Sequence, residues 1–134
     1  MREIKFRAWD KRRNKMYNVA RIIWINNEIR FVGIMGETEE EVITPYGIDN
    51  IILMQYTGLK DKNGREIYEG DIVEFNFFNE LKKGIIKFYG GAFWIDVKGE
   101  DIPILLGTGI EGCECEVIGN VYENPELLKE GDEK

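Results

Sequence analysis

The chain has 134 residues, of which 43% are hydrophobic and 12% aromatic. This is enough for one domain of ordinary size or two very small ones, and it excludes a wholly disordered chain. Histidine and serine are both absent, which excludes a Ser-His-Asp triad and a cysteine activated by histidine.

The charge is distributed unevenly along the chain, whose formal net charge is −7. Residues 1–21 carry eight Lys/Arg and two Asp/Glu, a net charge of +6, whereas residues 22–134 carry ten and twenty-three, a net charge of −13. The acidic body repels phosphate and so disfavours a nucleic-acid surface over the main fold. The basic head could contact nucleic acid, or it could pair with the acidic body of its own or a neighbouring chain.

Features of a secreted or membrane protein are missing from the sequence. No apolar run approaches the roughly 18 residues that span a bilayer. Residues 1–5 alternate charged and apolar side chains where a secretory signal would be continuously apolar. There are two cysteines, Cys113 and Cys115, fewer than a secreted disulfide scaffold of this size usually carries. We therefore expect a cytoplasmic protein.

The chain opens with a predicted strand and turn. The alternation of residues 3–9 places Ile4, Phe6 and Ala8 on one face of a half-buried strand. The charged stretch 10–15 predicts the turn that follows.

Further strands are expected in the rest of the N-terminal part. The β-prone runs 22–25 and 29–32 flank an Asn-Asn pair at 26–27, which predicts a two-residue hairpin. A capping-box pattern at 38–41 favours one short helical turn. The apolar run 51–56 predicts another strand.

From residue 57 onward, short β-prone runs alternate with glycine-containing breaks. These breaks lie at 61–64, 69–71, 83–84, 90–91 and 98–101, and the runs predict strands at 72–75, 85–88, 93–97, 102–106 and 113–122. Pro103 makes its run suitable for an edge strand. Five short strands between about 70 and 122 match the size of an SH3-like barrel. Asn124 and Pro125 predict the start of a short helix, followed by a frayed tail at 131–134.

The predicted fold is therefore mostly β, in two parts. Residues 1–57 form an N-terminal β-rich segment that contains the basic head. Residues 58–134 form a small SH3-like β-barrel with a short C-terminal helix.

Three blocks of sequence stand out along the chain. They are REIKFRAWD at 2–10, followed by Lys15-Met16; LMQYTGLKD at 53–61, followed by Asn63-Gly64 and by IYEGDIV at 67–73; and EVIGNVYENP at 116–125. In this order the blocks resemble the YopX family of phage and prophage proteins. The resemblance implies a gene carried by a bacteriophage or prophage, hence a bacterial host cell, and a β-rich fold with an SH3-like barrel in its C-terminal part. It implies no activity and no catalytic residues.

A glycine-rich segment at 107–112 matches G-x-G-x-x-G. A dinucleotide site would need a helix to begin there, because the helix N-terminus holds the pyrophosphate. Since 113–122 predicts a strand, an interstrand loop is favoured over a nucleotide site.

Two further candidate sites have structural interpretations that are favoured over chemical ones. Cys113 and Cys115 supply two ligands where a structural zinc site needs four, so buried thiols are favoured over a metal shared across a dimer. Glu69 and Asp71 could form an acid–base pair, but an Asp that accepts hydrogen bonds from turn amides is favoured. We therefore expect no catalytic residue, no cofactor and no metal.

Aromatic residues occur as adjacent pairs at 77–78 and 93–94. Neighbours on a strand point to opposite faces, so one member of each pair is expected to leave the core and mark a protein interface. We predict a non-enzymatic protein-interaction module that forms a homo-oligomer and contacts a host or phage protein; the alternative is nucleic-acid binding through the basic head. The candidate interaction residues are Trp9, Arg12, Arg13, Tyr17, Phe78 and Trp94.

Overall fold

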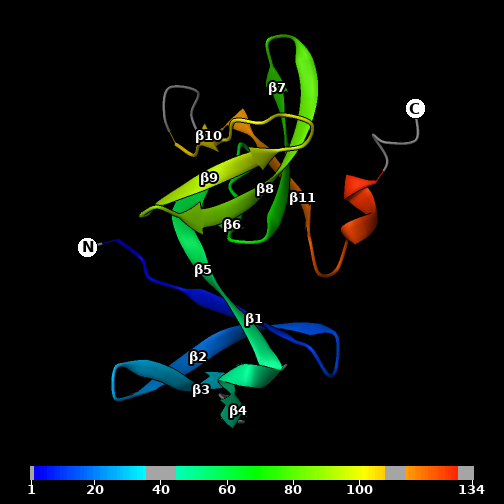
Figure 1. The fold of residues 1–134 in the computed structure, drawn as a ribbon. Helices are drawn as coiled ribbons and strands as arrows, with labels where there is room; N and C mark the ends of the chain where they lie inside the picture. The colour runs from blue at the N-terminus through cyan, green and yellow to red at the C-terminus, as the bar shows by residue number, and fades with distance from the viewer. Residues whose placement is uncertain (1, 36–44, 108–113, 130–134) are drawn as a thin grey trace. The chain divides into compact units, whose positions relative to one another are not determined.

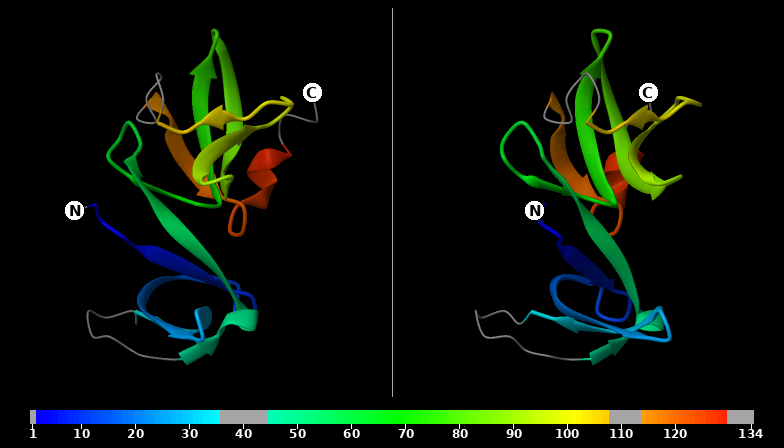
Figure 2. Two further views of the ribbon diagram at one scale, coloured as in Figure 1. Left: turned by 60° about the vertical axis from the view of Figure 1, so that its left-hand side comes forward. Right: turned by 90° about the vertical axis from the view of Figure 1, so that its left-hand side faces the viewer.

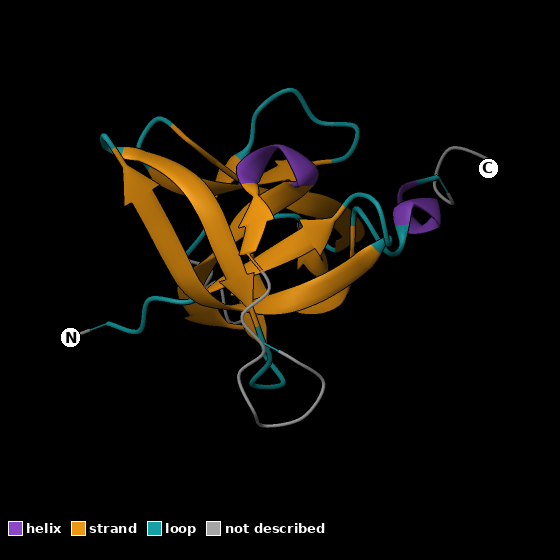
Figure 3. Ribbon diagram, turned by 90° about the horizontal axis from the view of Figure 1, so that it is seen from below, coloured by secondary structure: helices purple, strands orange, loops and turns teal. Residues whose placement is uncertain are grey.

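A computed structural model of the chain describes residues 2–35, 45–107 and 114–129, and most of these residues lie in strands (Figure 1). The predicted mostly-β fold is confirmed. Among these described residues, helix is limited to short 3₁₀ turns, such as η1 (Ile48–Asn50) and η3 (Pro125–Leu128) (Figure 3). Within the described ranges, no helix is long and apolar enough to cross a membrane.

The chain divides into two compact units. The N-terminal unit comprises Ile4–Gln55, and the C-terminal unit comprises Tyr56–Lys134 together with Met1–Glu3. The first three residues therefore group with the second unit, although they precede the first in sequence.

Antiparallel strands build the N-terminal unit. They are β1 (Phe6–Asp10), β2 (Lys15–Ile25), β3 (Glu28–Ile34), β4 (Pro45–Gly47) and the first half of β5 (Ile51–Lys60), in the order β4-β3-β2-β1-β5. The second half of β5 belongs to the C-terminal unit, where it pairs with β6 (Glu66–Tyr68).

The β2–β3 hairpin forms because two asparagines accept an unusual backbone conformation. Asn26 and Asn27 have φ angles of 54° and 66°, as both central residues of a type I′ turn require. Asparagine tolerates this left-handed region better than most residues. The turn pairs Ile25 directly with Glu28, so the predicted hairpin is confirmed. The predicted turn between β1 and β2 is confirmed as well.

Alternating residues of these strands supply a small core. Four of its side chains are buried and four more pack against them; the eight are Ala8, Val32, Ile34 and Ile51, then Tyr17, Val19, Ile29 and Leu53. Ile4 was predicted to share the face of Ala8. It lies before β1 and is 59% exposed, so this part of the strand prediction is wrong.

The C-terminal unit contains a second antiparallel sheet. Its strands are β7 (Asp71–Phe77), β8 (Glu80–Tyr89), β9 (Ala92–Val97), β10 (Ile104–Leu105) and β11 (Glu116–Asn120), in the order β10-β9-β8-β7-β11. The β7–β8 hairpin projects beyond the other strands of this sheet (Figure 2). Nine buried side chains form its core, namely Ile67, Val73, Phe75, Ile86, Ile95, Val97, Leu106, Cys115 and Val117.

The two edges of this sheet are different strands, β10 and β11. No described strand pairs one edge with the other, so the sheet is not closed into a barrel in the part of the chain that the structure covers. Pro103 immediately precedes the edge strand β10. This position agrees with the prediction that a proline-containing run would lie at an edge.

Two predictions in the C-terminal part are wrong. Phe78 was expected on a strand, but Phe78 and Asn79 have φ angles of 50° and 66° and form the turn between β7 and β8. The sequence does not indicate this turn, because phenylalanine is not a residue that favours positive φ. Gly84 was expected at a break, but it lies inside β8, opposite Val73 and Val97.

The C-terminal helix is present as the 3₁₀ turn η3, with Pro125 in its first turn as predicted. Asn124 makes no side-chain cap hydrogen bond to this turn. Its Oδ1 instead accepts the backbone N–H of Asn120 at 3.2 Å. The predicted helical turn at 38–41 lies outside the described residues. So do Cys113 and residues 108–112 of the glycine-rich segment, of which only Gly107 is described.

Candidate functional site

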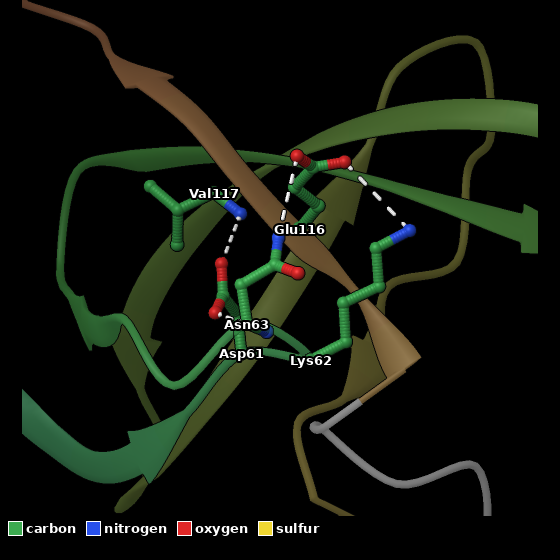
Figure 4. A network of polar contacts seen from close by, with 5 residues as sticks. All are labelled: Asp61, Lys62, Asn63, Glu116 and Val117. Atoms are coloured by element: carbon green, nitrogen blue, oxygen red, sulfur yellow. Dashed lines mark hydrogen bonds and ion pairs between the residues drawn. The ribbon is translucent and has the colours of Figure 1, made fainter.

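The carboxylate of Asp61 joins the turn after β5 to strand β11 (Figure 4). Its Oδ1 accepts the backbone N–H groups of Asn63 at 2.9 Å and Arg65 at 2.8 Å, and its Oδ2 accepts that of Val117 at 2.9 Å. The residue is only 5% exposed. Because β11 is an edge strand, Asp61 covers an N–H that the edge would otherwise offer to another chain.

Further contacts surround this carboxylate. The backbone N–H of Lys62 donates to the Cys115 carbonyl at 3.0 Å. Glu116 approaches the Lys62 ammonium at 3.7 Å and accepts the Asn63 side-chain amide at 3.4 Å. These side chains are exposed, so their ion pair contributes little to stability. The buried Asp61 is therefore the centre of the network.

Burial raises the pKa of Asp61, but the hydrogen bonds from the Val117, Arg65 and Asn63 amides, together with the positive charge of Arg65, lower it by more. The net effect is a pKa below the ordinary value of 3.8. The hydrogen bonds favour the ionised form because only the carboxylate accepts all three N–H groups with full charge. The folded protein thus holds Asp61 as a carboxylate.

The stability of the fold is expected to fall in acid through Asp61. A group whose pKa is lowered by folding stabilises the protein above its unfolded pKa, and this stabilisation is lost as the pH falls through the folded pKa. Below about pH 5 the free energy of unfolding of the wild type should therefore decrease more steeply than that of Asp61→Asn, by up to about 1.4 kcal/mol per pH unit. Urea unfolding between neutral pH and pH 2.5 would measure both slopes; equal slopes would contradict the expectation.

Two other buried aspartates hold turn amides in the same way. Oδ1 of Asp10 accepts the N–H groups of Arg12 at 2.9 Å and Arg13 at 3.2 Å, which shapes the β1–β2 turn. Oδ2 of Asp71 accepts the N–H of Tyr68 at 2.8 Å. The interpretation of Asp71 as a turn residue therefore agrees with its geometry.

Asn120 is the fourth buried polar side chain among the described residues. Its Oδ1 accepts the N–H groups of Tyr122 at 3.0 Å and Glu123 at 2.8 Å, and its Nδ2 donates to Oε1 of Glu123 at 2.8 Å. The side chain folds the segment that follows β11 back on itself.

These four residues explain the conspicuous sequence blocks. Asp10 lies in the first block, Asp61 and Asp71 in the second and Asn120 in the third. Each satisfies backbone N–H groups where the chain turns, so the blocks encode the geometry of these turns. The described part of the chain contains no group of three or more Cys, Asp or Glu side chains that could hold a metal ion.

The basic head exposes cationic side chains, but one of its two predicted aromatic rings is buried. Arg12 and Arg13 are exposed on the β1–β2 turn, while Trp9 is buried with 8% exposure. Tyr17 is half-buried, and the Lys15 ammonium lies 5.3 Å from its ring centroid. Trp9 therefore offers no open ring face for stacking, and nucleic-acid binding through this segment stays a prediction of the sequence.

Exposed apolar side chains gather on the β2–β3 hairpin instead. Ile23 pairs directly with Phe31, so their side chains share a face, and Ile25 follows Ile23 on that face two residues later. Ile23 is 37% exposed, Phe31 is 40% exposed and Ile25 is 46% exposed. We call these three residues the β2–β3 face. Trp24, on the opposite side of the strand, is 57% exposed.

The sequence did not single out the β2–β3 face. The run 22–25 is apolar at every position, which is typical of a strand buried on both sides. Only the tertiary structure shows that Ile23, Trp24 and Ile25 are exposed among the described residues.

A second exposed apolar group lies at the β7–β8 turn. Phe78 is 85% exposed and Leu81 is 65% exposed; we call these two residues the β7–β8 tip. The other predicted aromatic anchor, Trp94, is half-buried, stacks on Tyr89 at 5.6 Å and donates its indole N–H to the Tyr89 carbonyl at 3.0 Å. The structure thus leaves Phe78 more open than Trp94.

Comparison with known proteins places the chain in a family. The family model described as YopX protein matches residues 5–129. The chain belongs to the YopX family. The match includes Asp10, Asp61, Asp71 and Asn120, so the turn contacts described above lie within the family's region.

Relatives of known sequence and structure agree with this assignment. The SPbeta prophage-derived uncharacterized protein YopX of Bacillus subtilis (strain 168) is 34% identical over 70 residues, which cover 49% of this chain and 52% of the relative. The match thus spans about half the length of that YopX protein. Its crystal structure has a TM-score of 0.65 at 26% identity, covering 92% of this chain and 97% of the other. Protein EF1440 from Enterococcus faecalis has a TM-score of 0.66 at 29% identity, covering 96% and 99% of the two chains.

Proposed function

We propose that the protein is a phage- or prophage-encoded, non-enzymatic interaction module that acts in the bacterial cytoplasm and associates with itself through the β2–β3 face. The prophage origin is supported by the family and by the printed name of the Bacillus subtilis relative. The absence of histidine and serine from the chain and the turn roles of the buried aspartates support a non-enzymatic role.

The observation that carries the proposal is the composition of the β2–β3 face. Ile23, Ile25 and Phe31 are aliphatic and aromatic side chains on one side of two paired strands. Adjacent exposed apolar side chains of this kind are typical of protein interfaces. Two of the three side chains are aliphatic and cannot stack on bases, so this face suits a protein better than a nucleic acid.

The C-terminal unit is proposed to have an SH3-like arrangement. Five antiparallel strands of two to ten residues and an edge strand after a proline support it. The C-terminal unit would contact a host or phage protein, while the β2–β3 face contacts a second copy.

Self-association should depend on the β2–β3 face and persist at high salt. We expect a discrete oligomer of the wild type in size-exclusion chromatography with light scattering, at both low and high ionic strength, because an apolar contact is not screened. The dissociation constant of the double variant Ile23→Thr/Phe31→Thr should be at least about tenfold higher than that of the wild type, because threonine keeps the strand preference but removes apolar area. Ile102→Thr, which changes a side chain that is 79% exposed elsewhere, is the matched control. A monomeric wild type would refute the proposal.

A further inference from the structure

We infer that Asn63 is a site of spontaneous deamidation, and that the products loosen the turn through which Asp61 holds strand β11. In this reaction the backbone nitrogen of the residue after an asparagine attacks the side-chain amide. A following glycine allows the attack most readily, because it has no side chain to crowd the nitrogen. Asn63-Gly64 is the only Asn-Gly pair among the ten asparagines of the chain.

The structure leaves the reacting pair accessible. Asn63 and Gly64 are both exposed, in the turn that joins β5 to β6. Gly64 has a φ of 84°, and a Cβ built on it would meet no atom of the described residues within 4 Å. The space beside Gly64 is therefore open to water and to dissolved base.

Two hydrogen bonds must open before the reaction. The Gly64 N–H donates to the Asp61 carbonyl at 3.0 Å. The side-chain amide of Asn63 donates to Oε2 of Glu116 at 3.4 Å (Figure 4). Both bonds lie at an exposed turn, where local opening costs little free energy. The Gly64 nitrogen attacks after it has lost its proton to a base, so the reaction is faster at higher pH.

Water is the one co-reactant that the chemistry needs. The Gly64 nitrogen forms a bond to Cγ of Asn63, the bond from Cγ to Nδ2 breaks, and ammonia leaves with a proton taken from solvent. The product of this step is a cyclic succinimide. Water then adds to one of its two carbonyl carbons. Opening at Cγ leaves aspartate, whereas opening at the main-chain carbonyl leaves isoaspartate, and no atom is oxidised or reduced.

The aspartate product changes the charge beside Glu116. Its carboxylate replaces the amide of Asn63 that donates to Glu116, so a hydrogen bond is lost and two negative charges become neighbours. The Lys62 ammonium, 3.7 Å from Glu116, offsets part of the repulsion. These side chains are exposed, so the aspartate product should weaken the fold only slightly.

The isoaspartate product should have the larger effect, because it adds one carbon to the backbone of a tight turn. The turn closes where the Asp61 N–H donates to the Arg65 carbonyl at 2.8 Å. The Asp61 carboxylate also accepts the N–H groups of Asn63 at 2.9 Å and Arg65 at 2.8 Å. A longer backbone cannot keep all of these distances. The same carboxylate holds the Val117 N–H, so the edge strand β11 loses part of its cover.

Ageing of the full-length protein tests the site. The wild type would be incubated at 37 °C, at pH 6 and at pH 8.5, and cleaved after lysine so that residues 63–82 form one peptide. Fragmentation of this peptide by mass spectrometry compares Asn63 with Asn79, which also lies in a turn, with φ of 66°, but precedes glutamate. We expect conversion of Asn63 to be at least about tenfold faster than that of Asn79, and faster at pH 8.5. Equal rates at the two residues would overturn the inference.

A second measurement tests the effect on the fold. Isoaspartate-containing protein, separated by ion exchange and identified with an isoaspartyl methyltransferase, should have a Tm lower by roughly 5 °C than fresh protein. Its Val117 amide should also exchange with deuterium faster. If the Tm and this exchange rate stay unchanged, isoaspartate does not loosen the turn and this half of the inference is wrong.

Two variants separate the backbone change from other effects of ageing. Asn63→Gln keeps an amide but places it one carbon farther from the Gly64 nitrogen, so its Tm should not change during the same incubation. Fresh Asn63→Asp carries the new charge without the longer backbone, so its Tm should fall by less than that of the isoaspartate form. An equal loss of Tm in aged Asn63→Gln would show that the damage lies elsewhere in the chain.

Discussion

Replacing Asp61 by alanine is expected to lower the free energy of unfolding by about 4 kcal/mol. The change removes the acceptor of three backbone N–H groups, from Asn63, Arg65 and Val117. Hydrogen bonds to an ionised group contribute about 1.5–3 kcal/mol each, and a buried donor that loses its acceptor adds a desolvation penalty. Chemical denaturation at neutral pH would measure the loss.

Two variants serve as controls for Asp61→Ala. Asp61→Asn keeps one oxygen acceptor and should lose an intermediate amount. Asp96→Ala removes a carboxylate that lies 2.7 Å from the Lys87 ammonium and is 44% exposed, so it should cost less than about 1 kcal/mol. If Asp61→Ala costs no more than Asp96→Ala, the turn after β5 and strand β11 are joined by something other than this carboxylate.

The hairpins show which parts of the fold a sequence can determine. The Asn26-Asn27 turn and the Gly90-Gly91 turn were predicted correctly, because both residues of each pair tolerate the positive φ that they adopt. The Phe78-Asn79 turn has the same backbone signature but was missed. Local preference fails there because phenylalanine is held in that conformation against its preference.

The sites were less predictable than the strands. Asp61 was expected only in a local turn, and its contact with Val117 spans 56 residues. Nothing in the sequence near Asp61 indicates which strand edge it covers. Similarly, Trp9 and Trp94 were named as interaction residues for their aromatic rings, but Trp9 is buried and Trp94 is half-buried. Exposure depends on which other strands lie against a face, which periodicity along one strand does not determine.

The conspicuous sequence blocks therefore have a physical meaning in the turns that they form. Each contains a buried Asp or Asn that satisfies backbone N–H groups at a turn, as Asp10, Asp61, Asp71 and Asn120 do. Such residues are hard to replace, because only a few short side chains offer an acceptor at the same place, and the hydroxyls of Ser and Thr do so more weakly. The surface proposed for self-association lies outside these blocks, on the β2–β3 hairpin.

Gly84→Ala is expected to lower the free energy of unfolding by about 2 kcal/mol. A Cβ at this position would lie 2.5 Å from Cγ2 of Ile95, 3.0 Å from the Asp96 carbonyl oxygen and 3.3 Å from Cα of Val97. Two of these atoms are backbone of β9, which cannot move without disturbing its pairing with β8. The third belongs to a buried β-branched side chain with few alternative rotamers.

A second substitution separates crowding from backbone strain as the cause. In the background Ile95→Ala, which lacks Cγ2, adding Gly84→Ala should cost clearly less than it does in the wild type, so the double-mutant cycle should show favourable coupling. Gly58→Ala is the contrasting case: no atom lies within 4 Å of its added Cβ, but its φ is 88°, so it should lose about 1 kcal/mol through strain alone. If Gly84→Ala costs the same in both backgrounds, the requirement for glycine comes from the β9 backbone rather than from Ile95.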